Sequence, residues 1–510
     1  MTNSYSKAKK LYDLSVDLAS NWISKYYPNN NYKFFGVSIE KVQAFPQHHF
    51  FSSLCEKVPI ENMWDQYPTT TELSRRKNFD LIPKVIFRSL DLVKVLLSSK
   101  KSFRNLAACQ VLVLASGRHL DDLQSLLKHL NGKQQILIVG KITPKIQNWL
   151  RKEKINFLNV ESGSKFIRRW QRLKFLLFFV RSFWFKSRQH RLLATPQWRS
   201  RLWHLRLFQF PEIAALLTFA HNLFLQTKPK VIFTTTSNDT FGAAFCLAAQ
   251  ALGIKVAELQ HGIISYETIE SYYYQSNYYL VWGNIPKQLH PKNSYIIGCP
   301  YFESPKVKLA NPFFYKKKTL RVLILLSPPY GMLSLFKSKS NQQVLFDLVE
   351  GLSKLPSNYK IILRSHPSFP LSQIIKDFKL PVNFSISNNS STKQEIESSD
   401  VIISQATTAG LIAILLKKPF LFFDNSYLFE KFGEPFTNSE SAINVPLSSL
   451  EYIDRYVLNL LNNKRHLVKQ RKAQNKFIND YCSKFGKDAY RAIEKFMDET
   501  INHEKWEIYS

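Results

Sequence analysis

The chain has 510 residues, of which 45% are hydrophobic and 14% aromatic, and its formal net charge is +32. This length predicts about two or three domains, and this composition excludes a disordered chain. The large positive charge predicts an anionic partner, which is nucleic acid, an acidic membrane surface, or a phosphorylated or acidic sugar substrate.

The cysteines and the apolar segments indicate the compartment. The five cysteines are far apart and form neither a CxxC pair nor a zinc-site spacing, so we interpret them as reduced, mostly buried thiols of a cytosolic protein. The first residues lack the apolar core of a signal peptide. No window reaches the roughly 18 apolar residues that a membrane span needs. The sequence therefore predicts a cytoplasmic protein that is soluble or peripheral on the membrane.

The regular part of the chain starts after an N-terminal extension, residues 1–104, whose pattern assigns no fold. A strand at 109–115, a helix at 120–130 and a strand at 135–139 form a βαβ unit, which requires a parallel sheet. The turn after the first strand places Arg118 at a helix start, where a cation can help to hold an anion. The alternative is a plain capped helix, which the lack of a full GxGxxG or P-loop pattern in this turn favours.

Residues 164–210 interrupt this alternation of strands and helices with a basic and aromatic insertion. Arginine and lysine alternate with phenylalanine and tryptophan, and residues 164–188 contain no acid. A basic helix with an aromatic face is typical of peripheral binding to an anionic bilayer. The alternatives are a helical insertion with solvated arginines and a surface that stacks the bases of single-stranded nucleic acid.

A mostly apolar strand at 254–259 then ends abruptly in polar residues. Glu258, Gln260 and His261 lie at its end, next to Gly262. Open α/β sheets bind ligands at the carboxyl ends of their strands. A carboxylate and an imidazole there suit proton transfer, and a glycine lets a ligand approach the backbone. The alternative is a strand followed by an ordinary polar turn.

Strands at 278–283 and 294–300 complete this first α/β domain, and the basic run 305–318 is typical of a linker. A second α/β domain begins near residue 319. It contains predicted strands at 321–327, 359–367, 382–386, 401–404 and 419–423 and predicted helices at 341–355, 374–378, 393–399 and 409–416, and the pattern from about 448 to 500 is helical.

Three strands of the second domain end in groups that suit a phosphate. The first ends at Ser327, the second at Arg364 and His366, and the third at Ser404 through Thr408. The third runs directly into a helix, whose free amides and partial positive charge can join Thr407 and Thr408 in holding a phosphate. Arg364 offers two donors to phosphate oxygens, and His366 offers one at the same edge.

These motifs resemble those of bacterial GT-B glycosyltransferases that build surface polysaccharides. Glu258-Leu-Gln-His-Gly262, Tyr278 to Gly283 and Ile297-Gly-Cys-Pro300 resemble the strands that close the N-terminal domain of those enzymes. Arg364-Ser-His-Pro367 is similar to the His-Pro motif of the polysialyltransferase, capsular Kdo-transferase and CDP-glycerol glycerophosphotransferase groups. The segment from Ser398 to Ala413 is similar to their serine motif, which contacts nucleotide phosphates in those groups.

The resemblance covers about residues 105–470 without the basic insertion at 164–210, and it has two departures. Thr407 and Thr408 stand where a serine pair is common, so the hydroxyls are kept. The acidic pair followed by glycine that supplies the base in polysialyltransferases has no clear counterpart, so the base stays open.

The resemblance implies an α/β protein of the GT-B fold, with two Rossmann-like doubly wound domains facing across a cleft. Residues 105–304 would bind the acceptor, residues 319–470 would bind the nucleotide donor, and the helices of 471–510 would pack across both. The reaction would transfer a sugar from a CMP- or NDP-linked donor to a glycan or lipid-linked acceptor. Leaving-group charge would be carried by cations and helix dipoles. No metal or cofactor is expected, since no DxD-type pair lies in a suitable loop.

The roles implied for single residues follow from these positions. The general base would be Glu258 or Asp239, which lies in the turn between a predicted strand at 230–236 and a predicted helix at 243–252. His261 would act as an acid, a base or an orienting group. The acceptor side would include Gln260, Gly262 and Arg118. The donor would be held by Ser327, Arg364, His366, Ser404, Gln405, Thr407 and Thr408.

Three other functions remain open. A transferase of glycerol phosphate or ribitol phosphate from a CDP-linked donor would keep the fold and change only the transferred group. A non-catalytic nucleic-acid-binding protein is suggested by the charge alone, but no RNP, zinc-finger or helix-turn-helix pattern supports it. The third is a family member that has lost catalysis and acts as a scaffold in an assembly complex.

Overall fold

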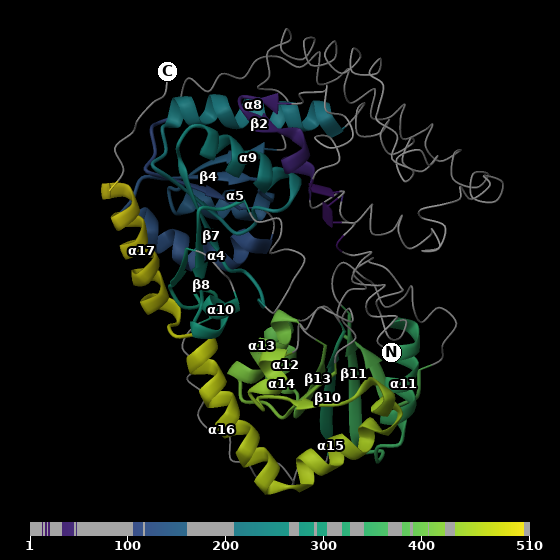
Figure 1. Cartoon of the computed structure of the whole chain (residues 1–510). Helices are drawn as coiled ribbons and strands as arrows, with labels where there is room; N and C mark the ends of the chain where they lie inside the picture. The colour runs from purple at the N-terminus through teal and green to yellow at the C-terminus, as the bar shows by residue number, and fades with distance from the viewer. Residues whose placement is uncertain are drawn as a thin grey trace, which may run out of the picture. The chain divides into compact units, whose positions relative to one another are not determined.

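The computed structural model of the chain (Figure 1) describes residues 13, 16–17, 19–20, 33–44, 47, 106–115, 118–160, 209–264, 275–289, 293–302, 319–326, 341–365, 380–387, 391–405, 407–423 and 434–503. Most of the N-terminal extension, the basic insertion up to residue 208 and the predicted helix at 374–378 lie outside this set. So do Ser327, His366 and the side chain of Arg118. The described residues fall into two compact units, one within Met1–Leu259, Tyr272–Tyr279 and Glu494–Ser510 and the other within Gln260–Ser271 and Leu280–Ile493.

The first sheet has seven strands in the order β5-β4-β3-β6-β7-β8-β9, and its pairings from β5 through β7 are parallel. Its central strands are short apolar runs with every residue buried, as expected for a sheet covered on both faces. The strands are β3 (Val111–Leu114), β4 (Ile136–Gly140), β5 (Asn156–Asn159), β6 (Val231–Thr234), β7 (Lys255–Leu259), β8 (Tyr278–Val281) and β9 (Ser294–Ile296). The helices between them are α4 (Arg118–Asn131), α5 (Pro144–Lys152), α8 (Phe210–Thr227), α9 (Thr240–Ala251) and α10 (Asn284–Leu289).

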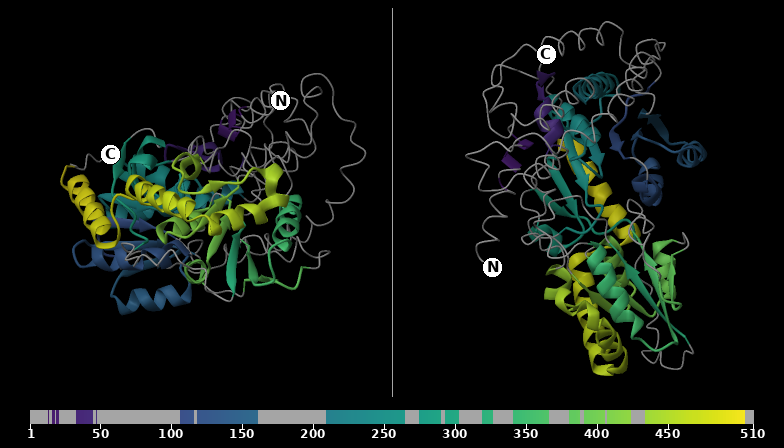
Figure 2. Two further views of the ribbon diagram at one scale, coloured as in Figure 1. Left: turned by 90° about the horizontal axis from the view of Figure 1, so that it is seen from below. Right: turned by 90° about the vertical axis from the view of Figure 1, so that its right-hand side faces the viewer.

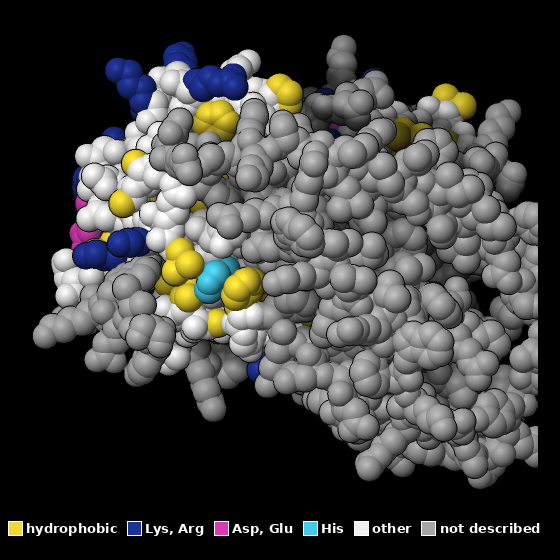
Figure 3. Space-filling view, turned by 90° about the horizontal axis from the view of Figure 1, so that it is seen from above, with side chains coloured by type: hydrophobic (Ala, Val, Ile, Leu, Met, Phe, Trp, Pro, Cys, Tyr) yellow, Lys and Arg dark blue, Asp and Glu magenta, His cyan; other side chains and the backbone are white. Residues whose placement is uncertain are grey.

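Helix α8 buries one face and leaves a small apolar patch on the other. Phe219 and Phe224 pack edge-on against Phe245 of α9. On the outer side, Leu225 is 48% exposed, and the ring of Phe35, next to β2 (Val37–Ser38), stacks on His221. Figure 3 shows hydrophobic side chains around a histidine on the upper face of the molecule. β2 pairs with β1 (Lys33–Phe34) in a separate two-stranded antiparallel sheet.

The second sheet has six strands in the order β12-β11-β10-β13-β14-β15, all paired in parallel. Its strands are β10 (Leu320–Leu325), β11 (Tyr359–Arg364), β12 (Phe384–Ile386), β13 (Val401–Ser404), β14 (Phe420–Phe422) and β15 (Ile443–Asn444). The helical elements of this region are α11 (Asn341–Ser353), α12 (Thr392–Ser398), α13 (Thr408–Leu415), α14 (Glu434–Asn438), the 3₁₀ helix η10 (Leu447–Tyr452), α15 (Ile453–Asn462) and α16 (Lys464–Tyr481).

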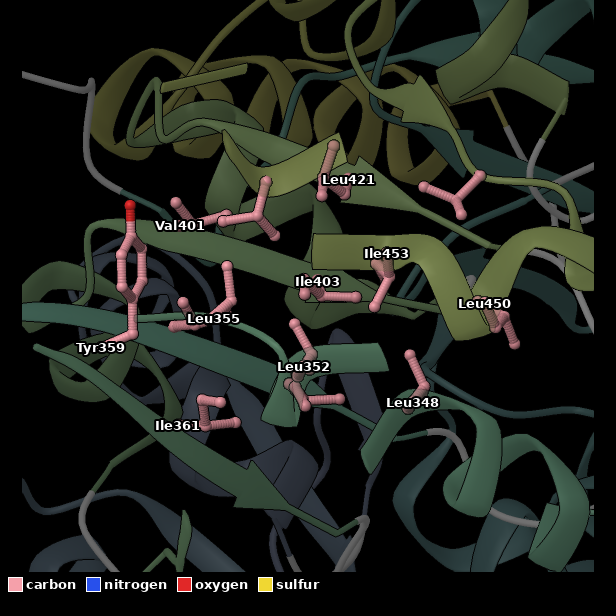
Figure 4. Packing of buried hydrophobic residues seen from close by; sticks show 14 of the residues in the cluster. Leu348, Leu352, Leu355, Tyr359, Ile361, Val401, Ile403, Leu421, Leu450 and Ile453 are labelled. Carbon is pink, nitrogen blue, oxygen red and sulfur yellow. The ribbon is translucent and has the colours of Figure 1, made fainter. Parts of the chain in front are cut away.

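One hydrophobic core joins the strands of this sheet to α11, η10 and α15. Leu348 and Leu352 of α11 pack with Ile403 of β13, and Leu450 and Ile453 close the core from η10 and α15, as Figure 4 shows. The views of Figure 2 show α15 and α16 following one another along the sheet. The prediction of two parallel, doubly wound sheets is therefore confirmed. The sequence patterns missed β1, β2, α5, β5, α10, α14 and β15, which are short or only partly apolar, and also α8, which directly follows the basic insertion.

Each sheet has a point where the strand order reverses. In the first sheet β3 lies between β4 and β6, and in the second β10 lies between β11 and β13. Open α/β sheets bind ligands at the carboxyl ends of the strands that flank such a reversal. The reversals therefore single out the residues after β3 and β6 in one sheet and those after β10 and β13 in the other.

The described cysteines and helices bear on the predictions of buried free thiols and of a chain without a membrane-spanning segment. Cys109, Cys246, Cys299 and Cys482 are buried free thiols, as predicted, and burial raises the pKa of Cys109 to about 12. Among the described residues, no helix is long and apolar enough to cross a membrane.

The last helix, α17 (Gly486–His503), is tied to α4 and the turn after it by charged and polar side chains. Glu494 accepts hydrogen bonds from Lys133 at 2.7 Å and pairs with His129 at 3.1 Å. Asp498 accepts a hydrogen bond from Gln134. The hydrogen bond from Lys133, followed by the effects of His129, holds the pKa of Glu494 below its usual range against the opposing effect of burial.

We expect Glu494→Gln to be less stable than the wild type at pH 7. A carboxyl whose pKa is lowered in the folded state stabilises that state above its unfolded pKa of about 4.3 and loses this contribution as the pH falls through the folded value. The difference should therefore shrink below about pH 4. Urea denaturation at several pH values measures it. Glu499→Gln is the control, because Glu499 lies on the same helix and forms an exposed pair with Lys495. A difference that stays constant with pH contradicts this role of Glu494.

Candidate functional site

The reversal point of the first sheet is lined by the starts of two helices. Arg118 begins α4 after β3, and Asp239 caps α9 after β6. The Asp239 carboxylate accepts a hydrogen bond from the Gly242 amide at 2.6 Å and one from the Thr236 hydroxyl at 3.3 Å. A side chain at Gly242 would lie 2.1 Å from the Thr236 carbonyl oxygen, so this turn requires glycine. Asp239 thus stabilises the helix start through its carboxylate.

Glu258 is a buried carboxylate that accepts hydrogen bonds from two serines. The Ser237 amide donates to its Oε1 at 3.1 Å, and the hydroxyls of Ser237 and Ser276 donate to its Oε2. Glu258 is only 4% exposed. Burial, and after it the charge of Glu258, raises the pKa of both Cys246 and Tyr279. Glu258 therefore joins the loop after β6 to the segment that enters β8, and its predicted role as a base stays a prediction.

Gln260 is fixed by the end of β8. Its side-chain Oε1 accepts a hydrogen bond from the Trp282 backbone amide at 2.9 Å. Its backbone carbonyl accepts one from the Trp282 indole at 3.0 Å, and its backbone amide donates to the Leu280 carbonyl. Its Nε2 donates to the carbonyl of Gly262 at 2.8 Å. Gln260 thus bends the chain after β7 into a defined turn, on which His261 is half-buried.

The turn after β7 brings two predicted motifs together. A Cβ added to Gly262 would lie 3.3 Å from the Thr408 hydroxyl oxygen, so the Gly262 backbone lies against the start of α13. His261 and Thr408 were predicted from separate stretches of the sequence. The described structure places the residue next to His261 beside Thr408.

Register in the second sheet places Arg364 and Ser404 in one row. Both pair with Leu325 of the central strand, so they lie two strands apart, about 10 Å. The buried Ser404 hydroxyl donates to the Gln405 carbonyl at 2.7 Å and lies 3.4 Å from the Thr407 hydroxyl. Thr407 caps α13 by accepting from the Gly410 amide at 3.2 Å. The predicted residues after β13 therefore form one turn at the reversal point.

Arg364 has an internal partner that the sequence patterns did not reveal. Its Nη1 donates to Glu395 Oε2 at 2.7 Å and to the Ser387 hydroxyl at 3.0 Å. The Ser387 hydroxyl in turn donates to Glu395 Oε1. The side chain of Glu395 is 8% exposed and that of Arg364 18%. A carboxylate beside the buried Ile396 was the available signal, but nothing in the local sequence joined it to Arg364.

This arrangement can bind an anion at the start of α13. A helix start presents backbone amides and about half a positive charge, and the Thr408 hydroxyl adds a donor or acceptor. The carboxylate of Glu395 offsets part of the positive charge of Arg364 at this edge. Within the described ranges, no group of three or more His, Cys, Asp or Glu side chains could hold a metal ion.

Comparisons with known proteins identify the fold. No protein-family model matches the chain, and no curated protein does. A solved structure of a putative UDP-N-acetylglucosamine 2-epimerase from Listeria monocytogenes matches with a TM-score of 0.50 and 9% identity, over 79% of this chain and 98% of that one.

Two further structures match at lower TM-scores. UDP-GlcNAc 2-epimerase from Neisseria meningitidis, bound to UDP-GlcNAc, matches with a TM-score of 0.46 and 12% identity, over 76% of this chain and 99% of that one. Spinosyn rhamnosyltransferase SpnG, complexed with spinosyn aglycone, matches with a TM-score of 0.43 and 12% identity, over 76% and 99%. At such identities a likeness shows the fold alone. The fold is of the GT-B type, with two Rossmann-like parallel sheets.

We expect Arg364→Ala to lower the free energy of unfolding by about 3–5 kcal/mol, because it leaves Glu395 buried without its cation. Arg364→Ala combined with Glu395→Ala should cost less than the sum of the two single substitutions. A double-mutant cycle in urea measures this coupling. Lys393→Ala with Glu397→Ala is the control pair, because those side chains are exposed on the same helix as Glu395 and lie 4.0 Å apart. Additive effects at Arg364 and Glu395 would show that the pair is not coupled.

Proposed function

We propose that this protein is a glycosyltransferase that moves a sugar from a CMP- or NDP-linked donor to a glycan or lipid-linked acceptor during the synthesis of a bacterial surface polysaccharide. One observation carries the proposal. The backbone of Gly262 lies against the hydroxyl of Thr408, which joins the Gln-His-Gly turn to the start of α13.

The donor end of the proposed site is the turn from Ser404 to Thr408. It lies at the reversal point of the second sheet and leads into a helix start, which favours a phosphate there. Thr407 is engaged in capping, so Thr408 and the first amides of α13 are the groups that we assign to the leaving phosphate. Ser327 and His366, which follow β10 and β11, complete the donor side in this proposal, and Gln405 lines the turn.

The reacting end of the proposed site is His261. Glu258 is buried among three hydrogen-bond donors, and Asp239 caps a helix. His261 is half-buried on the turn beside Thr408, so we favour it as the general base. In the proposed reaction, His261 takes the proton of an acceptor hydroxyl, whose oxygen bonds to the anomeric carbon. The bond from that carbon to the donor phosphate breaks, and the charge develops on an oxygen at the start of α13.

Two other reactions fit the same fold. The similar structure from Listeria monocytogenes is that of a putative UDP-N-acetylglucosamine 2-epimerase, which favours a sugar-nucleotide epimerase as a second candidate. Transfer of glycerol phosphate or ribitol phosphate from a CDP-linked donor is a third. Transfer releases nucleotide only when an acceptor is present, whereas epimerisation changes the donor sugar without an acceptor.

We expect the wild type to bind a nucleotide sugar and to release nucleotide on addition of an acceptor glycan. CMP-, UDP-, GDP- and CDP-linked donors are screened by calorimetry and by nucleotide release. Thr408→Val should weaken donor binding about fivefold to tenfold, because it removes one hydrogen bond to a charged group and keeps the side-chain shape. Thr500→Val, a threonine on α17 that donates to a helical carbonyl, is the control and should bind as the wild type does. No binding of any donor by the wild type would overturn the proposed function.

We also propose that the protein is cytoplasmic and associates with the inner face of the membrane through residues 164–210. The net charge of +32 and the alternation of basic and aromatic residues in that segment support the proposal. A lipid-linked acceptor would be reached from this surface.

We expect replacement of the arginines between 168 and 191 by glutamine to release the protein from vesicles that contain anionic lipid, because each basic residue near such a surface contributes about 1 kcal/mol. Vesicle sedimentation measures the bound fraction. Replacement of the exposed lysines of α16 (464, 469, 472 and 476) is the control for a general loss of charge. Equal release by both sets, or retention by the arginine variant, would contradict the assignment to this segment.

A further inference from the structure

The last residue of α16, Tyr481, is a fully buried side chain that bonds a loop 217 positions away in sequence. Its hydroxyl accepts from the Ile264 amide at 2.8 Å and donates to the Ile264 carbonyl at 3.1 Å. One side chain thus satisfies both backbone polar groups of one loop residue. Ile264 lies outside the strands and helices, so without Tyr481 its amide and carbonyl would lack a partner beside a buried ring. An unpaired polar group in such a place lowers stability.

Tyr481 is itself held firmly against the end of β8. Its ring stacks on Phe477 with centroids 5.0 Å apart and meets Trp282 edge-on. A Cβ at Gly283 would lie 2.6 Å from the backbone of Tyr481, so these two segments of the backbone approach as closely as glycine allows. The Ser483 amide donates to the Trp282 carbonyl at 3.0 Å. The hydroxyl of Tyr481 is therefore presented from a rigid position.

The turn after β7 is consequently anchored on both sides of His261 and Gly262. Before them, Gln260 bonds Trp282 and Leu280. After them, Ile264 bonds Tyr481. The Gly262 backbone lies against Thr408 between these two anchors. Burial raises the pKa of Tyr481 well above its usual value, so the hydroxyl stays protonated and can donate and accept throughout the neutral range.

We propose that Tyr481 is a positioning residue, which holds Ile264 and thereby fixes His261 and Gly262 against the start of α13. The inference rests on the proposed function, because it assigns the donor phosphate to that helix start and the proton transfer to His261. A displacement of about 1 Å between reacting groups can lower a rate by a factor of up to about 100. A turn that carries a reacting imidazole therefore benefits from anchors on both sides.

Tyr481→Phe tests the proposal, because it keeps the ring and removes only the hydroxyl. The backbone amides of residues 261–264 should exchange with deuterium about tenfold faster than in the wild type, since the bond to Ile264 is lost. With the best donor from the screen, kcat should fall about tenfold or more, whereas KM for the donor should stay within about twofold. The donor affinity should persist because Thr408 and α13 are not altered.

Phe477→Leu is the matched control. It removes a ring that stacks on Tyr481 in the same core, so it should lower stability, but it leaves the Tyr481 hydroxyl in place. Exchange at residues 261–264 and kcat should remain near wild-type values. If Phe477→Leu accelerates exchange and lowers kcat as much as Tyr481→Phe does, the effect belongs to the core in general and the proposal is overturned.

The other outcomes are equally decisive. Unchanged exchange in Tyr481→Phe overturns the anchoring, and faster exchange with wild-type kcat overturns its importance for the reaction. If Tyr481→Phe does not fold, Gln260→Met removes the side-chain bonds of the other anchor and should show the same division between kcat and KM. A wild type that binds no donor and turns none over contradicts the proposed function, and deuterium exchange alone then decides whether Tyr481 anchors the turn.

Discussion

Backbone groups left unpaired at strand ends and helix starts are the constraint on which the candidate site depends. Where a parallel strand ends, its chain leaves the ladder, and its amides and carbonyls need other partners. In this protein side chains supply many of them. Gln260 and Tyr481 bond the turn after β7, Asp239 caps α9, and Thr407 caps α13. The same bonds that satisfy the backbone also determine where His261 and Thr408 lie.

Buried charge imposes a second constraint on the same edges. A buried carboxylate is tolerated only when several donors surround it. Glu258 has the amide and hydroxyl of Ser237 and the hydroxyl of Ser276, and Glu395 has Arg364 and Ser387. The first cluster joins the loop after β6 to the segment before β8, and the second joins the end of β11 to the residue after β12 and to α12. The polar residues at these edges therefore serve folding first, and only some of them are available for chemistry.

The distinction between residues that serve folding and residues that serve chemistry reduces the set of groups that we assign to the reaction. Among the described candidates, Glu258, Gln260 and Arg364 each have a defined side-chain hydrogen-bond partner within the fold. His261 and Thr408 lie on the two segments that meet at Gly262. The proposed glycosyl transfer uses these two, with the charge of the leaving phosphate at the start of α13. Tyr481 then connects the end of α16 to the same turn.

The sequence by itself determined most of the buried strands and the edge of each sheet at which polar residues gather. Runs such as Val111–Leu114 and Val401–Ser404 predict buried parallel strands from apolar composition alone, and the polar residues that follow them mark the carboxyl edge of each sheet. Only the tertiary structure decided which of these residues meet. Glu258 and Ser237 are 21 positions apart, Arg364 and Glu395 31, and Ile264 and Tyr481 217. Periodicity reports which face of an element is buried, whereas strand order, register and helix docking depend on how all the elements pack at once.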